Sequence, residues 1–268
     1  NKTNHNNIKL LDGSAGKIVL QTGTNANDTM NIAFGSVKTK DIGLGARASL
    51  SSVATNFAAN AAPDLEDGDL ILNGVVVGAS LATDDSKSSA ANASSAIAKA
   101  AAINRVSAQS GVYATVNETV AFGSVMTAAA SNGTIKINGV DTATLYTTDD
   151  AELSRAAVIT AINNISGQTG VKAINTHDDS QGVVLVAEDG RNIEIDLGSL
   201  TAAATGLGAS NVYAGTYELN TLDGRAINVS SNVSGTLTNS GLNFGTFAAD
   251  TAQAVTLKRA STDAAPVE

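Results

Sequence analysis

The chain has 268 residues and a formal charge of −9, with 16 basic and 25 acidic side chains. Nucleic-acid binding needs clustered Lys and Arg that displace phosphate counterions, and the basic residues here are few and scattered. The absence of cysteine excludes disulfides and thiolate metal sites, and no apolar run approaches the roughly 20 residues that span a bilayer.

The apolar content predicts small modules rather than one deep core. Hydrophobic residues make up 43% of the chain, but much of this is alanine, aromatics are only 3% and tryptophan is absent. Alanine buries much less area than leucine or phenylalanine, so each core is expected to be thin. The chain opens Asn1-Lys2-Thr3 without a signal peptide pattern, and we interpret it as an interior fragment of a longer protein.

The first segment, residues 1–62, is expected to be rich in strands. Ile18-Val19-Leu20 and the alternating run from Met30 to Gly35 are typical of strands, with the turn-rich stretch Thr22–Asp28 between them. An Ala/Ser-rich stretch over residues 46–62 predicts a short helix that ends before Pro63.

An internal duplication follows. Gly68-Asp69-Leu70-Ile71-Leu72-Asn73-Gly74-Val75 returns as Gly133-Thr134-Ile135-Lys136-Ile137-Asn138-Gly139-Val140, an offset of 138 − 73 = 65. Each copy is a short strand that ends in Asn-Gly, which predicts a type I′ hairpin with positive φ at both turn residues. A second strand is expected around Val76–Leu81 and Thr142–Tyr146.

Each copy continues with an acidic pair and an amphipathic helix. Asp84-Asp85 and Asp149-Asp150 are predicted to cap the helices rather than to bind calcium. Apolar residues recur at helical spacing in both copies: Ala93, Ile97, Ala100, Ile103 and Val106 in the first, Leu153, Ala156, Ile159, Ile162 and Ile165 in the second. Both helices should end before a glycine that opens a strand, at Gly111 and Gly170. This offset is 170 − 111 = 59, so the first copy carries about six extra residues.

Two further segments resemble each other, Leu185–Ile195 and Leu219–Val229, and both are predicted to be hairpins that turn at Asp-Gly. We therefore expect an α+β fold of small antiparallel modules with two short helices in a tandem repeat. The expected segments are a β-rich part at 1–62, the first repeat at 63–127, the second repeat at 128–200, and a hairpin-rich part with a loose tail at 201–268.

Two groups of residues resemble bacterial flagellins. Leu10-Leu11-Asp12-Gly13 followed by Leu20-Gln21-Thr22-Gly23-Thr24-Asn25 is similar to the end of their conserved N-terminal region, with Leu20 where the family usually has Phe. The second repeat is similar to the flagellin hook-type Ile-Asn motif, and the first repeat matches it less well. The matching residues are Ile135-Lys136-Ile137-Asn138-Gly139, Ala161-Ile162-Asn163, Thr169-Gly170-Val171-Lys172-Ala173 and the Asp-Gly hairpin. Long heptad-patterned helices, which hold flagellin subunits in the filament core, do not occur here.

The resemblance implies an outer, extracellular part of a flagellar filament, exported without a cleavable signal peptide, whose partners are other flagellin subunits. It implies no enzyme activity, no cofactor, no nucleic-acid or membrane partner, and leaves surface glycosylation open. One alternative is a segment of a hook-associated or filament-cap protein, which shares the Ile-Asn motif. Another is a surface adhesin that binds glycans, although four Tyr and no Trp offer few aromatic platforms.

No catalytic, cofactor-binding or metal-binding residue is assigned. Gly13-Ser14-Ala15-Gly16-Lys17 lacks the first glycine and the final Ser/Thr of a phosphate loop, so a turn is expected. Gly43-Leu44-Gly45 and Gly206-Leu207-Gly208 lack the third glycine of a dinucleotide motif and are interpreted as flexible connectors. With His5 and His177 as the two histidines, no zinc-protease motif exists, and His177-Asp178-Asp179 is interpreted as a loop.

Overall fold

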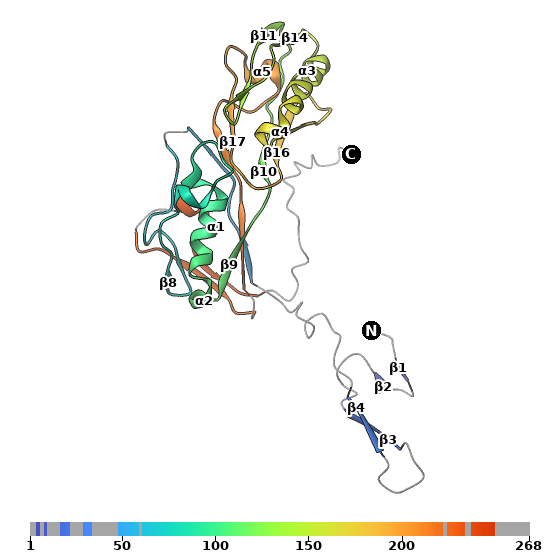
Figure 1. Cartoon of the computed structure of the whole chain (residues 1–268), viewed down its shortest axis with the longest axis vertical. Helices are drawn as coiled ribbons and strands as arrows, with labels where there is room; N and C mark the ends of the chain where they lie inside the picture. The colour runs from blue at the N-terminus through green and yellow to red at the C-terminus, as the bar shows by residue number, and fades with distance from the viewer. Residues whose placement is uncertain are drawn as a thin grey trace, which may run out of the picture. The chain divides into compact units, whose positions relative to one another are not determined.

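A computed structural model describes residues 4–5, 8–9, 17–21, 29–33, 48–58, 61–221, 224–233 and 237–249. The chain forms two compact units, one of Asn1–Arg47 with Ala249–Glu268 and one of Ala48–Ala248 (Figure 1). Helices and antiparallel strands in small sheets make it an α+β protein, which confirms the predicted fold class.

The strands predicted near the start of the chain are confirmed. In the first unit, β3 (Lys17–Gln21) pairs with β4 (Thr29–Ala33), and the short strand β1 (Asn4–His5) pairs with β2 (Ile8–Lys9). The turn expected at Thr22–Asp28 lies outside the described residues.

The helix predicted at residues 46–62 is wrong. The described part of this stretch forms two short strands, β5 (Ser49–Ser51) and β6 (Thr55–Phe57). Between them, the N–H of Ser52 donates to the carbonyl oxygen of Tyr217 (2.9 Å), and the Ser52 hydroxyl accepts the Tyr217 N–H (2.9 Å). Serine and threonine compete with helical hydrogen bonds in this way, and the distant strand supplies the partner that the local pattern does not reveal.

Both sequence copies contain a hairpin, a helix with a one-turn extension, and a strand. In the first copy these are β7 (Ile71–Leu72), β8 (Val75–Val76), α1 (Ala96–Arg105), α2 (Ser107–Ser110) and β9 (Val112–Val116). In the second they are β12 (Lys136–Ile137), β13 (Val140–Asp141), α3 (Ala151–Asn164), α4 (Ser166–Thr169) and β15 (Lys172–Asn175). The second strand of each hairpin lies earlier than predicted: β8 shares only Val76 with the predicted Val76–Leu81. In the second copy β13 ends before Thr142, and Leu145 and Tyr146 belong to β14 (Leu145–Thr147).

The other elements of this unit connect or complete these parts. They are η1 (Ala82–Asp84), η2 (Asn92–Ser94), β10 (Thr119–Ala121), β11 (Ser131–Gly133), β14 (Leu145–Thr147), β16 (Val183–Ala187), β17 (Ile193–Asp196), α5 (Ala202–Thr205), β18 (Val212–Ala214), β19 (Tyr217–Thr221), β20 (Ile227–Ser230), α6 (Leu237–Ser240) and β21 (Gly245–Phe247). Figure 1 shows α1 and α2 with β8 and β9, and α3 and α4 with β10, β14 and β16.

The turns and helix ends that depend on local residues are confirmed. Asn73 and Gly74 have φ of 50° and 82°, and Asn138 and Gly139 have φ of 48° and 80°, as a type I′ turn requires. The short helices α2 and α4 end at Gly111 and Gly170, both in the left-handed conformation that glycine adopts without steric cost.

Both predicted Asp-Gly hairpins are wrong, because the strands on the two sides of each turn join different sheets. The strand before the turn, β16 or β19, pairs with the strand that follows the helix, β15 or β9. The strand after the turn, β17 or β20, pairs with the Asn-Gly hairpin through β12 or β7. In both copies the chain therefore passes from one sheet to the other between these two strands.

This pairing nests the second copy inside the first. Strands β19 and β20, at residues 217–230, complete the sheets of the first copy, although they follow the whole of the second copy along the chain. The chain leaves β9 at Asn117 and returns at Thr216, where the Asn117 N–H donates to the Thr216 carbonyl oxygen (2.9 Å). The segment boundaries at 62/63, 127/128 and 200/201 stay predictions from the sequence, and strand pairs form across all three.

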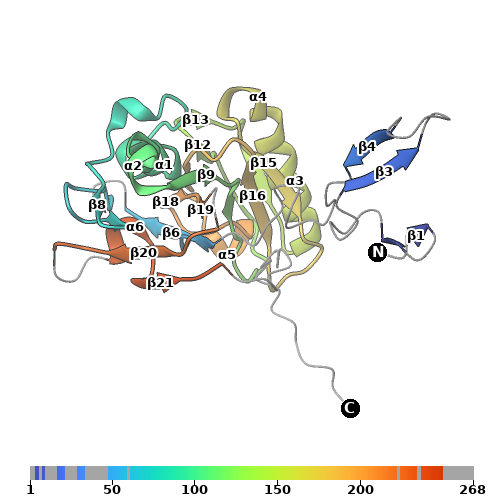
Figure 2. The same ribbon diagram turned by 90° about the horizontal axis from the view of Figure 1, so that it is seen from below.

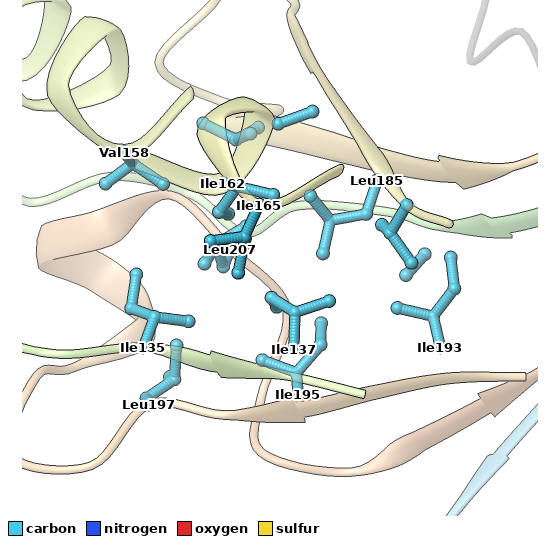
Figure 3. Close-up of a cluster of buried hydrophobic side chains, with 14 of the residues drawn as sticks. Ile135, Ile137, Val158, Ile162, Ile165, Leu185, Ile193, Ile195, Leu197 and Leu207 are labelled. Atoms are coloured by element: carbon cyan, nitrogen blue, oxygen red, sulfur yellow. The ribbon is translucent and has the colours of Figure 1, made fainter. Parts of the chain in front are cut away.

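The second copy has a continuous core of its own. Figure 3 shows α3 and β16 contributing side chains from one side and β12 and β17 from the other. All buried members of this cluster come from residues 121–207: Ala121, Ile135, Ile137, Leu145, Val158, Ile162, Ile165, Val171, Ala173, Val183, Leu185, Ala187, Ile193, Ile195, Leu197, Leu200 and Leu207. The residues between Asn117 and Thr216 thus bury an apolar core without side chains from the first copy.

The predicted inward face is confirmed in part for both helices. Ala100 and Ile103 in the first copy and Ile162 and Ile165 in the second are buried, as predicted, but Leu153 is 61% exposed. In the first turn of α3 the buried side chains are Ser154 and Arg155, and the Ser154 hydroxyl donates to the Thr148 carbonyl oxygen (3.2 Å). This polar anchor turns residues 154 and 155 inward, a contact that apolar periodicity cannot reveal.

Candidate functional site

The asparagine of each Asn-Gly turn joins three elements of its copy. In the second copy, the Asn138 side chain accepts the Glu194 N–H at Oδ1 (2.8 Å), and Nδ2 donates to the Thr169 carbonyl oxygen (3.0 Å). The Asn138 N–H also donates to the Glu194 carbonyl oxygen (3.1 Å). One residue therefore ties the hairpin to β17 and to the end of α4.

The first copy repeats this arrangement. The Asn73 side chain accepts the Asn228 N–H (2.8 Å) and donates to the Ser110 carbonyl oxygen (2.9 Å), and its N–H donates to the Asn228 carbonyl oxygen (2.9 Å). The asparagine of the Asn-Gly turn thus has two roles: it adopts the positive φ of the turn, and its side chain bonds to backbone groups of two other elements. The Asn-Gly turn is predictable from the sequence, whereas these hydrogen-bond partners, which lie far away along the chain, are not.

A second asparagine covers the free edge of the strand that follows each helix. Asn163 of α3 donates to the Ala173 carbonyl oxygen (3.0 Å) and accepts the Ala173 N–H (2.8 Å). Asn104 of α1 makes the same two bonds with Ala114, at 2.9 and 2.8 Å. Covering a sheet edge in this way removes backbone groups that would otherwise pair with another chain.

The acidic pairs differ between the copies. Asp150 caps α3 as predicted, since its Oδ1 accepts the N–H groups of Glu152 (2.9 Å) and Leu153 (3.1 Å). Neither Asp84 nor Asp85 caps α1, which begins later and is capped by Ser95. The prediction is therefore wrong for the first copy.

Asp85 instead organises the extra residues of the first copy. Burial raises the pKa of Asp85, but hydrogen bonds from Ser88, from Ser95 and from the backbone outweigh burial and lower it below its usual value. Ser88 Oγ in turn accepts the N–H of Asn192 (2.8 Å), whose Nδ2 donates to the carbonyl oxygens of Ala90 (3.1 Å) and Ala91 (3.0 Å). The extra residues of the first copy thus form a loop that hydrogen-bonds to Asn192, directly after the Asp-Gly turn of the second copy.

A shallow hollow of about 560 Å³ lies at the start of α3. It is the hollow that contains His177, so it is where a binding site that uses this residue would lie. Its lining residues are Asp150, Ala151, Glu152, Arg155, His177, Asp178 and Asp179. Arg155 is 4% exposed and is paired with Asp179. Hydrogen bonds from the Ser180 hydroxyl and N–H lower the pKa of Asp178, which makes that carboxylate a weak proton acceptor. His177 lies in the loop that the sequence placed there.

The remaining candidate motifs do not form sites among the described residues. Gly13–Gly16 and Gly43–Gly45 lie outside them. The interpretation of Gly206-Leu207-Gly208 as a flexible connector is wrong, because this stretch is tightly packed. Gly206 ends α5, its carbonyl oxygen accepts the Ser124 and Val183 N–H groups, and a Cβ on Gly208 would lie 2.3 Å from the Tyr213 hydroxyl.

Lys99, on α1, is an ionisable group that the sequence did not mark as buried. It is 5% exposed and lines a small cavity of about 10 Å³ together with Ser52, Ser94 and Tyr217. Burial lowers the pKa of Lys99 to about 8, against the attraction of Asp64. Complete burial raises the pKa of Tyr217 well above its usual value.

We expect Lys99→Met to stabilise the protein at pH 7, where the native state holds a buried ammonium group. The folded-state pKa of about 8 lies below the usual 10.5, so the unfolded state binds more protons between these values and the burial cost falls as pH rises from 8 to 10.5. The gain should be roughly 1–3 kcal/mol at pH 7 and should vanish by about pH 10.5. Urea unfolding at pH 7 and pH 10 measures it.

Lys136→Met, at a half-exposed lysine beside Asp141 (3.9 Å), is the control for this experiment and should show no such difference between the two pH values. A Lys99→Met variant less stable than wild type at pH 7 would contradict the assigned burial cost.

Among the described residues, no three His, Asp or Glu side chains lie close enough to hold a metal ion. The helices in the described ranges are too short or too polar to cross a membrane. No known protein-family model matches the chain, and no curated protein sequence matches it.

Proposed function

We propose that this chain is the outer, solvent-facing part of a bacterial flagellin and forms part of the extracellular surface of a flagellar filament. Its partners are other subunits of the same polymer. Its contribution is to filament diameter, surface chemistry, packing between neighbours and antigenicity, and no catalytic role is assigned. The resemblance of Ile8–Ser14, of Leu20–Thr29 and of the Ile-Asn repeats to flagellins supports this function.

The observation that carries the proposal is the path of the chain through the unit Ala48–Ala248. Where the unit begins, the Ala48 carbonyl oxygen accepts the Thr221 N–H (3.3 Å), and near its end Phe247 pairs with Ile227. Thr221 and Ile227 are the two ends of one short connection between β19 and β20. The chain therefore enters and leaves at the same end, as a domain must when it projects from a polymer core.

The residues of the shared motif also fit a structural role. Asn73, Asn138, Asn104 and Asn163 use their side chains to hold turns, helix ends and strand edges of the same copy. At the hollow beside His177 the Ser180 hydroxyl donates to Asp178 (2.7 Å), but the lowered pKa of this carboxylate makes it a weak base for activating a nucleophile.

Immunogold electron microscopy tests the proposal. Antibodies raised against residues 48–248 should label flagellar filaments along their whole length in cells that produce this chain. Labelling confined to the base or the tip of the filament would favour a hook-associated or cap protein, and labelling of the cell surface alone would favour an adhesin. Either result would overturn the proposal.

A further inference from the structure

The two copies contain equivalent three-stranded sheets, β10-β16-β15 in the second copy and β5-β19-β9 in the first. Each sheet turns one face towards its own core, through Ala121, Leu185 and Ala173 in the second copy and through Leu219 and Ala114 in the first. Figure 2 shows β15 and β16 beside α3. Because side chains alternate along a strand, the neighbouring residues face away from the core in both sheets.

The outward face of the second copy's sheet is mostly apolar, with Lys172 as the charged residue opposite Val186. Ile174 is opposite Val184, Val186 is opposite Val120, and Phe122 follows directly after β10 on the side of Val120. Phe122 is 58% exposed and Ile174 is 50% exposed, while the three valines are half-buried. We call Val120, Phe122, Ile174, Val184 and Val186 the apolar sheet face.

In the first copy the positions equivalent to the apolar sheet face are polar, while Tyr113 stands where the second copy has Lys172. In the register shared by the two sheets, Thr115, Glu218 and Ser51 stand where the second copy has Ile174, Val184 and Phe122. Likewise Asn220 and Ser49 replace Val186 and Val120. The architecture thus forms with a polar outer face, so folding does not require the apolar residues of the second copy.

We propose that the apolar sheet face is a lateral contact between two copies of this chain. Lys172 lies on the same side of the sheet, opposite Val186, and pairs with Glu188 (2.6 Å), so the two charges beside the apolar residues balance each other. Two copies, each with a formal charge of −9, can therefore approach here with less repulsion than over the acidic surface. The equivalent face of the first copy includes Glu218 and offers no such surface.

The size of the face limits the contact to a weak one. A stable free dimer buries about 800 Å² on each partner from about 20–30 residues, far more than five side chains supply. Such a contact forms when copies are already held side by side at high effective concentration. The choice of a second copy therefore rests on the proposed function, in which subunits are neighbours in a filament.

Sedimentation of the 268-residue chain at up to about millimolar concentration tests the contact. The wild-type chain should associate weakly, and a triple variant with Phe122→Ser, Val184→Glu and Ile174→Thr should remain monomeric. These substitutions introduce the residues of the first copy's sheet, so the variant should keep its circular dichroism spectrum. Leu153→Ser, at an exposed leucine on α3, is the matched control and should associate like wild type.

Cross-linking locates the contact, because the chain has no cysteine of its own. Under mild oxidation Ile174→Cys should form disulfide-linked dimers several-fold faster than Thr115→Cys, its equivalent in the first copy. A monomeric wild-type chain, an associating triple variant, or equal cross-linking rates would overturn the proposal. Because these measurements need no filament, a failed immunogold experiment would overturn the proposed function without deciding this contact.

Discussion

Asn138→Gly is expected to lower the free energy of unfolding by about 2–3 kcal/mol, a melting-temperature decrease of roughly 5–10 °C. Glycine accepts the φ of 48° at this position, so the turn itself is retained. The loss comes from the bonds to Glu194 and to Thr169, and from the greater freedom of glycine in the unfolded chain. Chemical denaturation followed by circular dichroism measures the change.

Asn138→Asp separates the two side-chain bonds. It keeps an acceptor for the Glu194 N–H and loses the donor to the Thr169 carbonyl oxygen, so its stability should lie between those of wild type and Asn138→Gly. Asn73→Gly should reproduce the effect in the first copy. An Asn138→Gly variant within about 0.5 kcal/mol of wild type would show that the turn alone accounts for the motif.

The second large effect concerns removal of the nested copy. Replacing residues 118–216 by a single glycine leaves the two-residue turn Asn117-Gly between Val116 and Tyr217, which already pair as partners in β9 and β19. The remaining chain should fold, with a cooperative thermal transition, because β7, β20, β9, β19 and α1 all remain. Circular dichroism and NMR spectra test this outcome.

Deleting residues 64–200 is the control. This deletion removes the two repeats as the sequence alone delimits them, without regard to the strand pairing. It removes β7 and β9, the partners of β20 and β19, and should leave an unfolded product. The isolated segment 117–216 should fold by itself, since its core cluster comes from residues 121–207. A folded product of the 64–200 deletion, with an unfolded product of the 118–216 replacement, would contradict the nested arrangement.

Sequence reasoning succeeded where the cause is local. The positive φ of Asn138 and Gly139, the glycine end at Gly170 and the cap at Asp150 each depend on residues within one turn of the chain. The side chains of these residues determine the local conformation directly. The strands Lys17–Gln21 and Thr29–Ala33 were also predictable from their own residues.

The errors occurred where the deciding partner is distant in sequence. Nothing within residues 46–62 reveals that Ser52 bonds to Tyr217, and nothing near Asp189-Gly190 reveals which sheet receives the next strand. Lys99 on a helix gives no sign of burial, because burial depends on β19 and on residues near Ser240. The difference in polarity between the two outer sheet faces is also invisible in the sequence, because only the strand registers show that Thr115 and Ile174 are equivalent.

The bond between Asn117 and Thr216 has a consequence for the order of folding. Strands β9 and β19 are separated by roughly a hundred residues, and closing a loop of that length in an open chain costs about 3 kcal/mol more in entropy than closing a loop of a few residues. If the inner copy forms first, it brings Asn117 beside Thr216 and removes most of that cost. The inner copy then acts as the nucleus on which the outer copy closes, so substitutions in its core should slow the folding of both.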